Sequence, residues 1–249
     1  MKNLVFLTIS FLCFNFFTSC GDENFEPYTY TEKRLLPSKI TITTYNGAGD
    51  PIATETLILK YDNLNRLISE QTSSESSEFT RDFYYDKDGN VSKVKTQLST
   101  SLDISDYVYL YVNANQVIEE LYVNAELKET STLDLNNGKL IKKDSPEDGI
   151  TTFEYDVPGN LTGKTHDGLV LTYAYGASIG IASNVRTPQW SLLSSQGELG
   201  LTHFLVNNIT LDDNGYTYQY EYETSSAYPS TVIIDGGTKV MSIMYMPIK

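Results

Sequence analysis

The segment Phe79–Leu98, FTRDFYYDKDGNVSKVKTQL, reads as two β-strands joined by a tight turn. Arg81 and Phe83 fall on one face of the first strand, because side chains alternate along extended backbone. Asp86 suits the first position of a type I turn, where its carboxylate accepts backbone N–H groups. Gly89 suits the left-handed residue that follows. The segment therefore predicts a half-buried antiparallel hairpin.

Variants of this hairpin recur along most of the chain, at intervals of 24, 26, 22, 22 and 20 residues. The anchor positions that define these intervals are Tyr61, Tyr85, Tyr111, Leu133, Tyr155 and Tyr175. Recurrence near one period marks a repeat architecture in which each hairpin leans on its neighbours. The extended runs are rich in Val, Ile, Thr and Tyr, as strands are. The sequence predicts an all-β fold, an antiparallel meander of repeated hairpins that forms a curved, partly closed sheet.

Three of the turns share the pattern Tyr-Asp-x-x-(Gly/Asn)-(Asn/Arg)-(Leu/Val), at Tyr61–Leu67, Tyr85–Val91 and Tyr155–Leu161. They resemble the YD repeats of RHS-type bacterial proteins. With its leader and the closing Tyr228-Pro229-Ser230, the chain from about Lys39 onward also resembles YD-repeat-like lipoproteins of Gram-negative bacteria. The motif is a turn signature without catalytic residues, so the resemblance implies a fold and a cell-envelope location but no chemistry.

Residues 1–19 read as a secretory leader, with one basic residue, Lys2, before an apolar run from Leu4 to Phe17. A helix of that run covers about 21 Å, which is short of the ~30 Å hydrocarbon core of a bilayer, so a signal peptide is favoured over a membrane span. The stretch Phe17–Cys20 resembles a lipobox, where signal peptidase cuts before a cysteine that becomes lipidated. The alternative is an ordinary leader followed by an incidental cysteine.

The cysteine count favours the lipoprotein interpretation. The chain has two cysteines, Cys13 within the leader and Cys20 at the cut, so the mature monomer has no partner for a disulfide. Several acyl chains on Cys20 would hold the protein in a membrane effectively permanently. We therefore expect an outer-membrane lipoprotein that faces the periplasm or the cell surface.

Between the anchor and the β domain, residues 20–37 read as a tether. Its acidic residues Asp22, Glu23 and Glu26 resemble the short export signals of surface-displayed lipoproteins, and a solvated linker is the alternative. The β domain is predicted to span residues 38–249. Within it, residues 180–208 break the hairpin pattern, and Thr187 or Pro188 can open a short helix that packs on the sheet.

Charge and motif spacing exclude several classes of function. The formal net charge of −14 and the lack of a basic stripe disfavour nucleic-acid binding. The segment Asp86–Asn90 has its glycine at the wrong position for an EF-hand, so a hairpin turn is favoured over a weak calcium site. His166 next to a turn and His203 among apolar residues do not form a catalytic constellation. We expect no metal, no cofactor and no enzymatic activity, with a paired-carboxylate hydrolase as the least favoured interpretation.

The aromatic residues give the candidate ligand site: Trp190, Tyr216, Tyr218, Tyr220 and Tyr222. The four tyrosines share one face of a strand. Exposed, they would form a platform for sugar rings, with Trp190 nearby; covered, they would be a core face with phenol hydroxyls at its rim. We expect a non-enzymatic surface binding module for a glycan or an envelope protein. The alternative is a periplasmic carrier or sensor of a hydrophobic ligand, held on the concave face of the sheet.

Overall fold

A computed structural model describes residues 34–195, 201–224 and 226–248. The predicted signal peptide, Cys20 and the tether up to residue 33 lie outside the described residues. Contacts divide the chain between Thr31 and Glu32, and the description below concerns the second unit, Glu32–Lys249, by itself.

The described residues form strands that are joined mostly by tight turns, with one α-helix and two short 3-10 helices. The strands are β1 (Leu35–Tyr45), β2 (Pro51–Tyr61), β3 (Leu67–Ser73), β4 (Glu78–Tyr85), β5 (Val91–Leu98), β6 (Ile104–Asn113), β7 (Gln116–Val123), β8 (Glu126–Asn136), β9 (Lys139–Ser145), β10 (Gly149–Tyr155), β11 (Leu161–His166), β12 (Leu169–Thr172), β13 (Ala174–Ile179), β14 (Asn207–Leu211), β15 (Tyr218–Tyr222), β16 (Pro229–Ile234) and β17 (Lys239–Pro247). The helices are α1 (Gln189–Ser194), η1 (Leu201–Phe204) and η2 (Asp235–Gly237).

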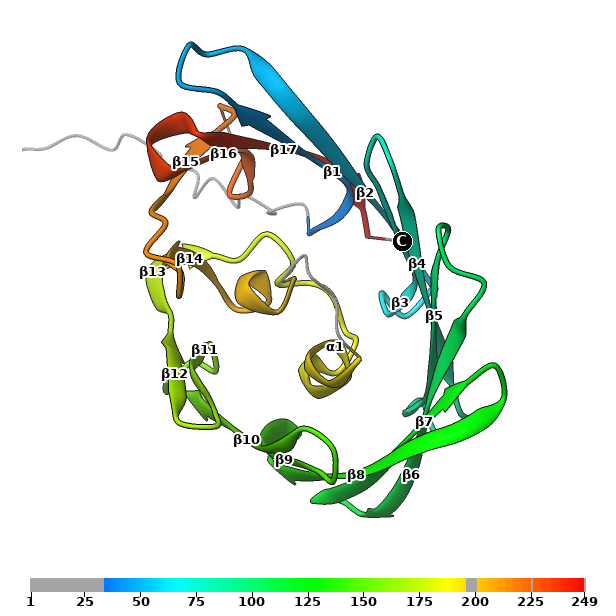
Figure 1. The fold of residues 1–249 in the computed structure, drawn as a ribbon. Coiled ribbons are helices and arrows are strands. Elements are labelled where there is room, and N and C mark those ends of the chain that lie inside the picture. The colour runs from blue at the N-terminus through cyan, green and yellow to red at the C-terminus, as the bar shows by residue number, and fades with distance from the viewer. Residues whose placement is uncertain (1–33, 196–200, 225, 249) are drawn as a thin grey trace, which may run out of the picture. The chain divides into compact units, whose positions relative to one another are not determined.

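Fifteen of the strands form one sheet, in the order β12 back through β1 and then β17, β16 and β15. All its pairings are antiparallel, and the C-terminal strand β17 pairs with the first strand β1. The sheet curves around α1, and its end strands β12 and β15 are not hydrogen-bonded to each other (Figure 1). The separate pair β13–β14 lies between these two ends. The predicted all-β meander with a short helical insert is confirmed.

The predicted turn chemistry is also confirmed. Asp86 Oδ1 accepts the backbone N–H groups of Asp88 and Asn90, both at 2.9 Å. Gly89 has φ +89°, a conformation that strains any residue with a Cβ. Asp62 and Asp212 make the same two kinds of contact at their own turns. The aspartate of the repeat therefore acts as the acceptor that holds each turn in shape.

The tyrosine of the repeat ties each hairpin to the one before it. Tyr85 Oη donates a hydrogen bond of 2.8 Å to the backbone carbonyl of Leu67, the residue that closes the preceding turn. The same bond recurs in the pairs Tyr61–Pro37, Tyr111–Val91, Tyr155–Leu140 and Tyr175–Leu161. A register shift follows each of these turns, and such a bulge leaves backbone groups without a ladder partner. The phenol supplies that partner.

The insert between β13 and β14 covers the concave face of the sheet. Trp190 and Leu192 of α1 and Leu201 and Phe204 of η1 are buried in the same cluster as the inward residues of the strands. The helix begins at Gln189, directly after Pro188, so the predicted helix start is confirmed. The part of the insert from residue 196 to residue 200 lies outside the described residues.

Thr187 joins the insert to the first repeat. The N–H of Leu67 donates to Thr187 Oγ1 at 2.7 Å, and Thr187 Oγ1 lies 3.0 Å from Tyr85 Oη. Because Tyr85 donates its hydrogen to the Leu67 carbonyl, Thr187 is the donor to the tyrosine. Both backbone groups of Leu67 are thus satisfied through one closed ring of hydrogen bonds.

The sheet begins before the predicted boundary at Ser38. Strand β1 starts at Leu35, and Leu36 is 1% exposed and lies opposite Met246 of β17. Proline normally marks the end of a central strand, but Pro37 is tolerated here because β1 bulges between Pro37 and Lys39. The last residues of the predicted tether therefore belong to the sheet.

Candidate ligand-binding site

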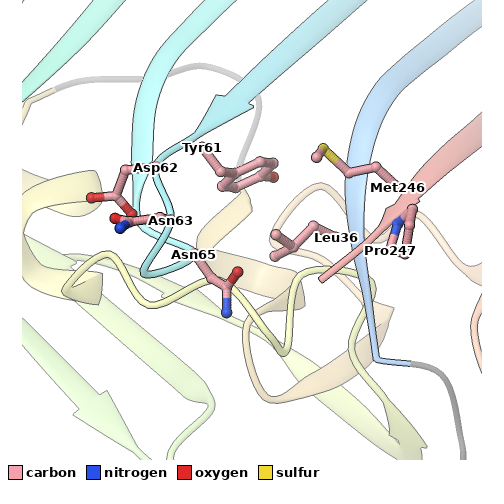
Figure 2. A pocket seen from close by; sticks show the side chains of 7 residues that line it. All are labelled: Leu36, Tyr61, Asp62, Asn63, Asn65, Met246 and Pro247. Atoms are coloured by element: carbon pink, nitrogen blue, oxygen red, sulfur yellow. The ribbon is translucent and has the colours of Figure 1, made fainter. Parts of the chain in front are cut away.

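A cavity of about 90 Å³ opens beside the paired strands β1 and β17. Its walls come from β1, from β17 and from the turn between β2 and β3. The lining residues are Leu36, Tyr61, Asp62, Asn63, Asn65, Met246 and Pro247. Figure 2 shows Asp62 and Asn63 on one side and Leu36, Met246 and Pro247 on the other. The cavity thus has one polar and one apolar side.

Strand pairing explains why these residues meet. Leu36 of β1 lies opposite Met246 of β17, and Leu35 lies opposite Pro247. Strand β2 pairs with the other edge of β1 and ends at Tyr61, so the first repeat turn lies beside the β1–β17 seam. Burial and the nearby Glu70 carboxylate raise the pKa of Tyr61 far above its ordinary value. Its hydroxyl is held as a donor to the Pro37 carbonyl, so the tyrosine offers the cavity its ring.

Two carboxamides on the polar side have no hydrogen-bond partner in the part of the chain that the structure describes. Asn63 is exposed and Asn65 is half-buried, and neither side chain hydrogen-bonds to any residue in the described ranges. Asn65 has φ +63°, and its backbone carbonyl accepts the N–H of Arg186 at 3.0 Å. Its backbone is therefore fixed by the turn and by the insert, while its amide group is free to bind a ligand.

Asp62 is already committed to the turn. Its Oδ1 accepts the N–H groups of Leu64 and Arg66, and its Oδ2 accepts the Arg66 guanidinium at 2.7 Å. Partial burial raises the pKa of Asp62, but the hydrogen bonds from Arg66 and Leu64 and the charge of Arg66 outweigh it, so the pKa lies below its usual range. The carboxylate is ionised and neutralised by Arg66, so the described residues that line the cavity contribute no net charge.

Trp190 is not part of an exposed platform. It is 3% exposed, and its ring meets Tyr109 edge-on with the centroids 4.9 Å apart. Tyr111 meets the same ring at 6.1 Å. The tryptophan therefore serves as the core contact of α1, and its place in the predicted ligand site is wrong because the helix turns it toward the sheet.

The predicted tyrosine row is mostly a core face. Tyr216, Tyr218 and Tyr220 pack against the buried cluster, while Tyr222 is 41% exposed. Tyr218 Oη donates to Asp212 Oδ2 at 2.7 Å, and Tyr220 Oη donates to the backbone carbonyl of Ile209. Tyr220 thus bonds to a backbone carbonyl as the repeat tyrosines do, while Tyr218 bonds to a turn carboxylate. The row does not present a line of free ring faces.

Buried charges on the concave face hold the insert in place. Arg81 pairs with Glu70, and both side chains are almost fully buried. Arg81 Nη1 also donates to the Leu192 carbonyl at 3.4 Å and to Ser195 Oγ at 3.3 Å, at the C-terminal end of α1, where a cation is favoured.

A second buried carboxylate lies nearby on β7. Glu119 accepts Lys143 Nζ at 2.7 Å, while its Oε2 has no hydrogen-bond partner among the described residues. Burial raises the pKa of Glu119, and the charge of Lys143 opposes that effect. Because the atom is sealed from solvent, this group acts inside the structure and not at a surface.

The two histidines differ in their surroundings. His166 is partly exposed and its Nδ1 lies 2.9 Å from Thr151 Oγ1. His203 stacks on Tyr173 with ring centroids 4.3 Å apart, so the prediction that it is a packed residue is confirmed. In the part of the chain that the structure describes, no group of three or more His, Cys, Asp and Glu side chains is placed to hold a metal ion. Within the same ranges, no helix has the length and apolar character that a transmembrane span requires.

Sequence reasoning did not find the cavity. The residues Tyr61–Asn65 were recognisable only as a repeat turn, and their role in a site depends on Leu36 and Met246, which come from opposite ends of the chain. The turn differs from the Tyr85 and Tyr155 turns in carrying Asn65 where they have Gly89 and Gly159, but Asn115 stands at the same position after Tyr111, so this difference does not single out the site.

No protein-family model and no curated protein matches the chain. Among solved structures, it is similar to a porin-like protein from Bacteroides uniformis ATCC 8492, with a TM-score of 0.44 and 13% sequence identity. The alignment covers 84% of this chain and 98% of that one.

Proposed function

We propose that the protein is a non-enzymatic binding module of the cell envelope, anchored to the outer membrane through lipidated Cys20, and that it recognises a glycan at the cavity between Leu36 and Asn65. The observation that carries the ligand proposal is a small cavity lined by Asn63 and Asn65 together with the apolar residues Leu36, Met246 and Pro247. Neither carboxamide has a hydrogen-bond partner among the described residues. Ligand sites typically combine apolar walls with a few polar groups that fix orientation.

A neutral, hydroxyl-rich ligand suits this arrangement. A carboxamide both donates and accepts hydrogen bonds, as a sugar requires. Among the described lining residues Asp62 carries the only carboxylate, and Arg66 neutralises it. The Tyr61 ring supplies an aromatic surface of the kind that packs against apolar faces of ligands. Aromatic and amide groups together replace the Trp190 platform that the sequence suggests.

The anchor proposal rests on the lipobox-like stretch that ends at Cys20. Trp190, Leu192, Leu201 and Phe204 of α1 and η1 pack on the concave face, where the alternative of a hydrophobic-ligand carrier would hold its ligand. We therefore favour a surface site over an interior one.

Two measurements test the proposal. The full chain should sediment with outer membranes and yield an acylated N-terminal peptide by mass spectrometry, whereas the Cys20→Ser variant should do neither; recovery of unacylated wild-type protein in the soluble fraction contradicts the anchor. The Cys20→Ser protein, which keeps Leu36 and the whole sheet, should bind a subset of glycans on an array. An array that stays blank at high protein concentration contradicts the glycan proposal.

A further inference from the structure

The chemistry of the cavity narrows the ligand class, and this step rests on the proposed function. We infer that the cavity takes the acetamido group of an N-acetylated amino sugar, with the amide edge on Asn63 and Asn65 and the methyl group against Leu36 and Met246.

Size limits what can enter. The cavity holds about 90 Å³, well below the ~300 Å³ at which pockets for drug-sized ligands begin. A whole sugar ring does not fit inside, but one substituent of a ring does, while the ring itself rests on the rim. The cavity therefore recognises one substituent of a sugar and not the sugar ring itself.

The two sides of the cavity match the two ends of an acetamido group. This group carries one N–H donor, one carbonyl acceptor and a methyl group. The unbonded carboxamides of Asn63 and Asn65 offer both donors and acceptors. The opposite wall, formed by Leu36, Met246 and Pro247, gains from covering a methyl group. A plain hydroxyl in the same position would leave that wall in contact with water.

Charge excludes ionic substituents from the same position. Asp62 Oδ2 accepts the Arg66 guanidinium, whose Nη2 lies 2.6 Å away. Asp62 Oδ1 accepts the backbone N–H groups of Leu64 and Arg66. Among the described residues that line it, the cavity thus has neither a free cation to hold a carboxylate or phosphate nor a free carboxylate to hold an ammonium group. An uncharged amide is the polar group that it suits best.

Peptides also contain amide groups, but strand pairing argues against them. An extended peptide commonly binds by adding a strand to a sheet edge. Here β1 pairs with β2 on one side and β17 on the other, so the strand that lines the cavity has no free edge. A glycan substituent needs no such edge.

The test compares three probes by isothermal titration with the Cys20→Ser protein at physiological salt: tri-N-acetylchitotriose, cellotriose and a short N-acetylated glycine peptide amide. The two sugars differ in the acetamido group at C2. We expect the acetylated sugar to bind at least about tenfold more tightly than the other two probes. Cellotriose lacks the acetamido group that contacts the cavity, and the peptide amide lacks the sugar ring that rests on its rim.

Matched variants inside and outside the cavity show whether the acetylated sugar binds there. Asn65→Gly removes the carboxamide but suits the positive φ of the turn, and it should weaken binding of the acetylated sugar by about tenfold or more, since it removes hydrogen bonds to the ligand. Asn137→Gly makes the same change at another positive-φ turn residue, outside the cavity, and should leave binding unchanged. Should Asn65→Gly not fold, Asn63→Ala at the exposed rim serves instead.

Each outcome decides something. Equal affinity for the two sugars overturns the acetamido inference but keeps the glycan proposal. Tighter binding of the peptide overturns the inference in favour of a protein ligand. Acetylated-sugar binding that Asn65→Gly and Asn63→Ala leave intact also overturns it, because the glycan then binds elsewhere. If all three probes are silent and the glycan array is blank, the proposed function itself fails.

Discussion

Removing one phenol hydroxyl from the repeat should loosen the sheet measurably. Tyr85→Phe deletes the hydrogen bond to the Leu67 carbonyl at 2.8 Å and the acceptor for Thr187 at 3.0 Å. The ring remains in place, so the loss is that of the polar contacts. Leaving a buried backbone acceptor without a partner costs about 1–3 kcal/mol. We expect the free energy of unfolding to fall by about 2 kcal/mol, which lowers Tm by roughly 4–8 °C in a domain of this size.

The neighbouring residue provides the control. Tyr84 is exposed on the opposite face of β4. Lys93 Nζ lies over its ring, 4.7 Å from the centroid, and a Tyr84→Phe substitution keeps that ring. Tyr84→Phe should therefore change stability by less than about 0.5 kcal/mol. Urea unfolding followed by tryptophan fluorescence measures both, because Trp190 is buried in the core. If the two variants unfold at the same urea concentration, the tyrosine bond does not join the hairpins as described.

Two further predictions concern buried charges and protons. Arg81→Met leaves Glu70 buried without its partner and should cost about 3–5 kcal/mol, and adding Glu70→Met should recover most of that loss; urea unfolding that shows no recovery in the double variant contradicts the pairing. Burial lowers the pKa of His203 to about 4, against the opposing charges of Asp213 and Asp212, and the unfolded chain has a pKa near ~6.5. The unfolded state then binds more protons below pH ~6.5, so stability present above that pH should fall by about 3 kcal/mol as the pH drops to about 4. His203→Gln should remove this fall in the free energy of unfolding between pH ~6.5 and about 4, and His166→Gln should not. If the pH dependence of unfolding is the same in both variants and in the wild-type protein, this account is wrong.

The local parts of the fold could be predicted because their causes are local. Asp86 and Gly89 specify their turn through backbone contacts within five residues, and period-two burial follows from alternation along the strand. The helix after Pro188 could also be placed, since proline favours the first turn of a helix. Each of these features is written in a short stretch of sequence.

The candidate site could not be predicted because it depends on contacts between distant parts of the chain. Nothing near Leu36 indicates that Met246 lies opposite it, and Pro37 argues locally against a strand. The tyrosine row shows the same limit. Its common face was predictable, but only the packing of Tyr218 near Phe204 and the bond from Tyr220 to Ile209 decide that this face is covered.

The pairing of β1 with β17 also has a consequence for biogenesis. Strand β1 is synthesised long before its partner β17, which follows all the other described strands in the chain. Contacts between such distant segments form slowly, because the entropy of closing a long loop is lost before the contacts can stabilise the chain. We therefore expect the contact between β1 and β17 to form late in folding, after the local hairpins.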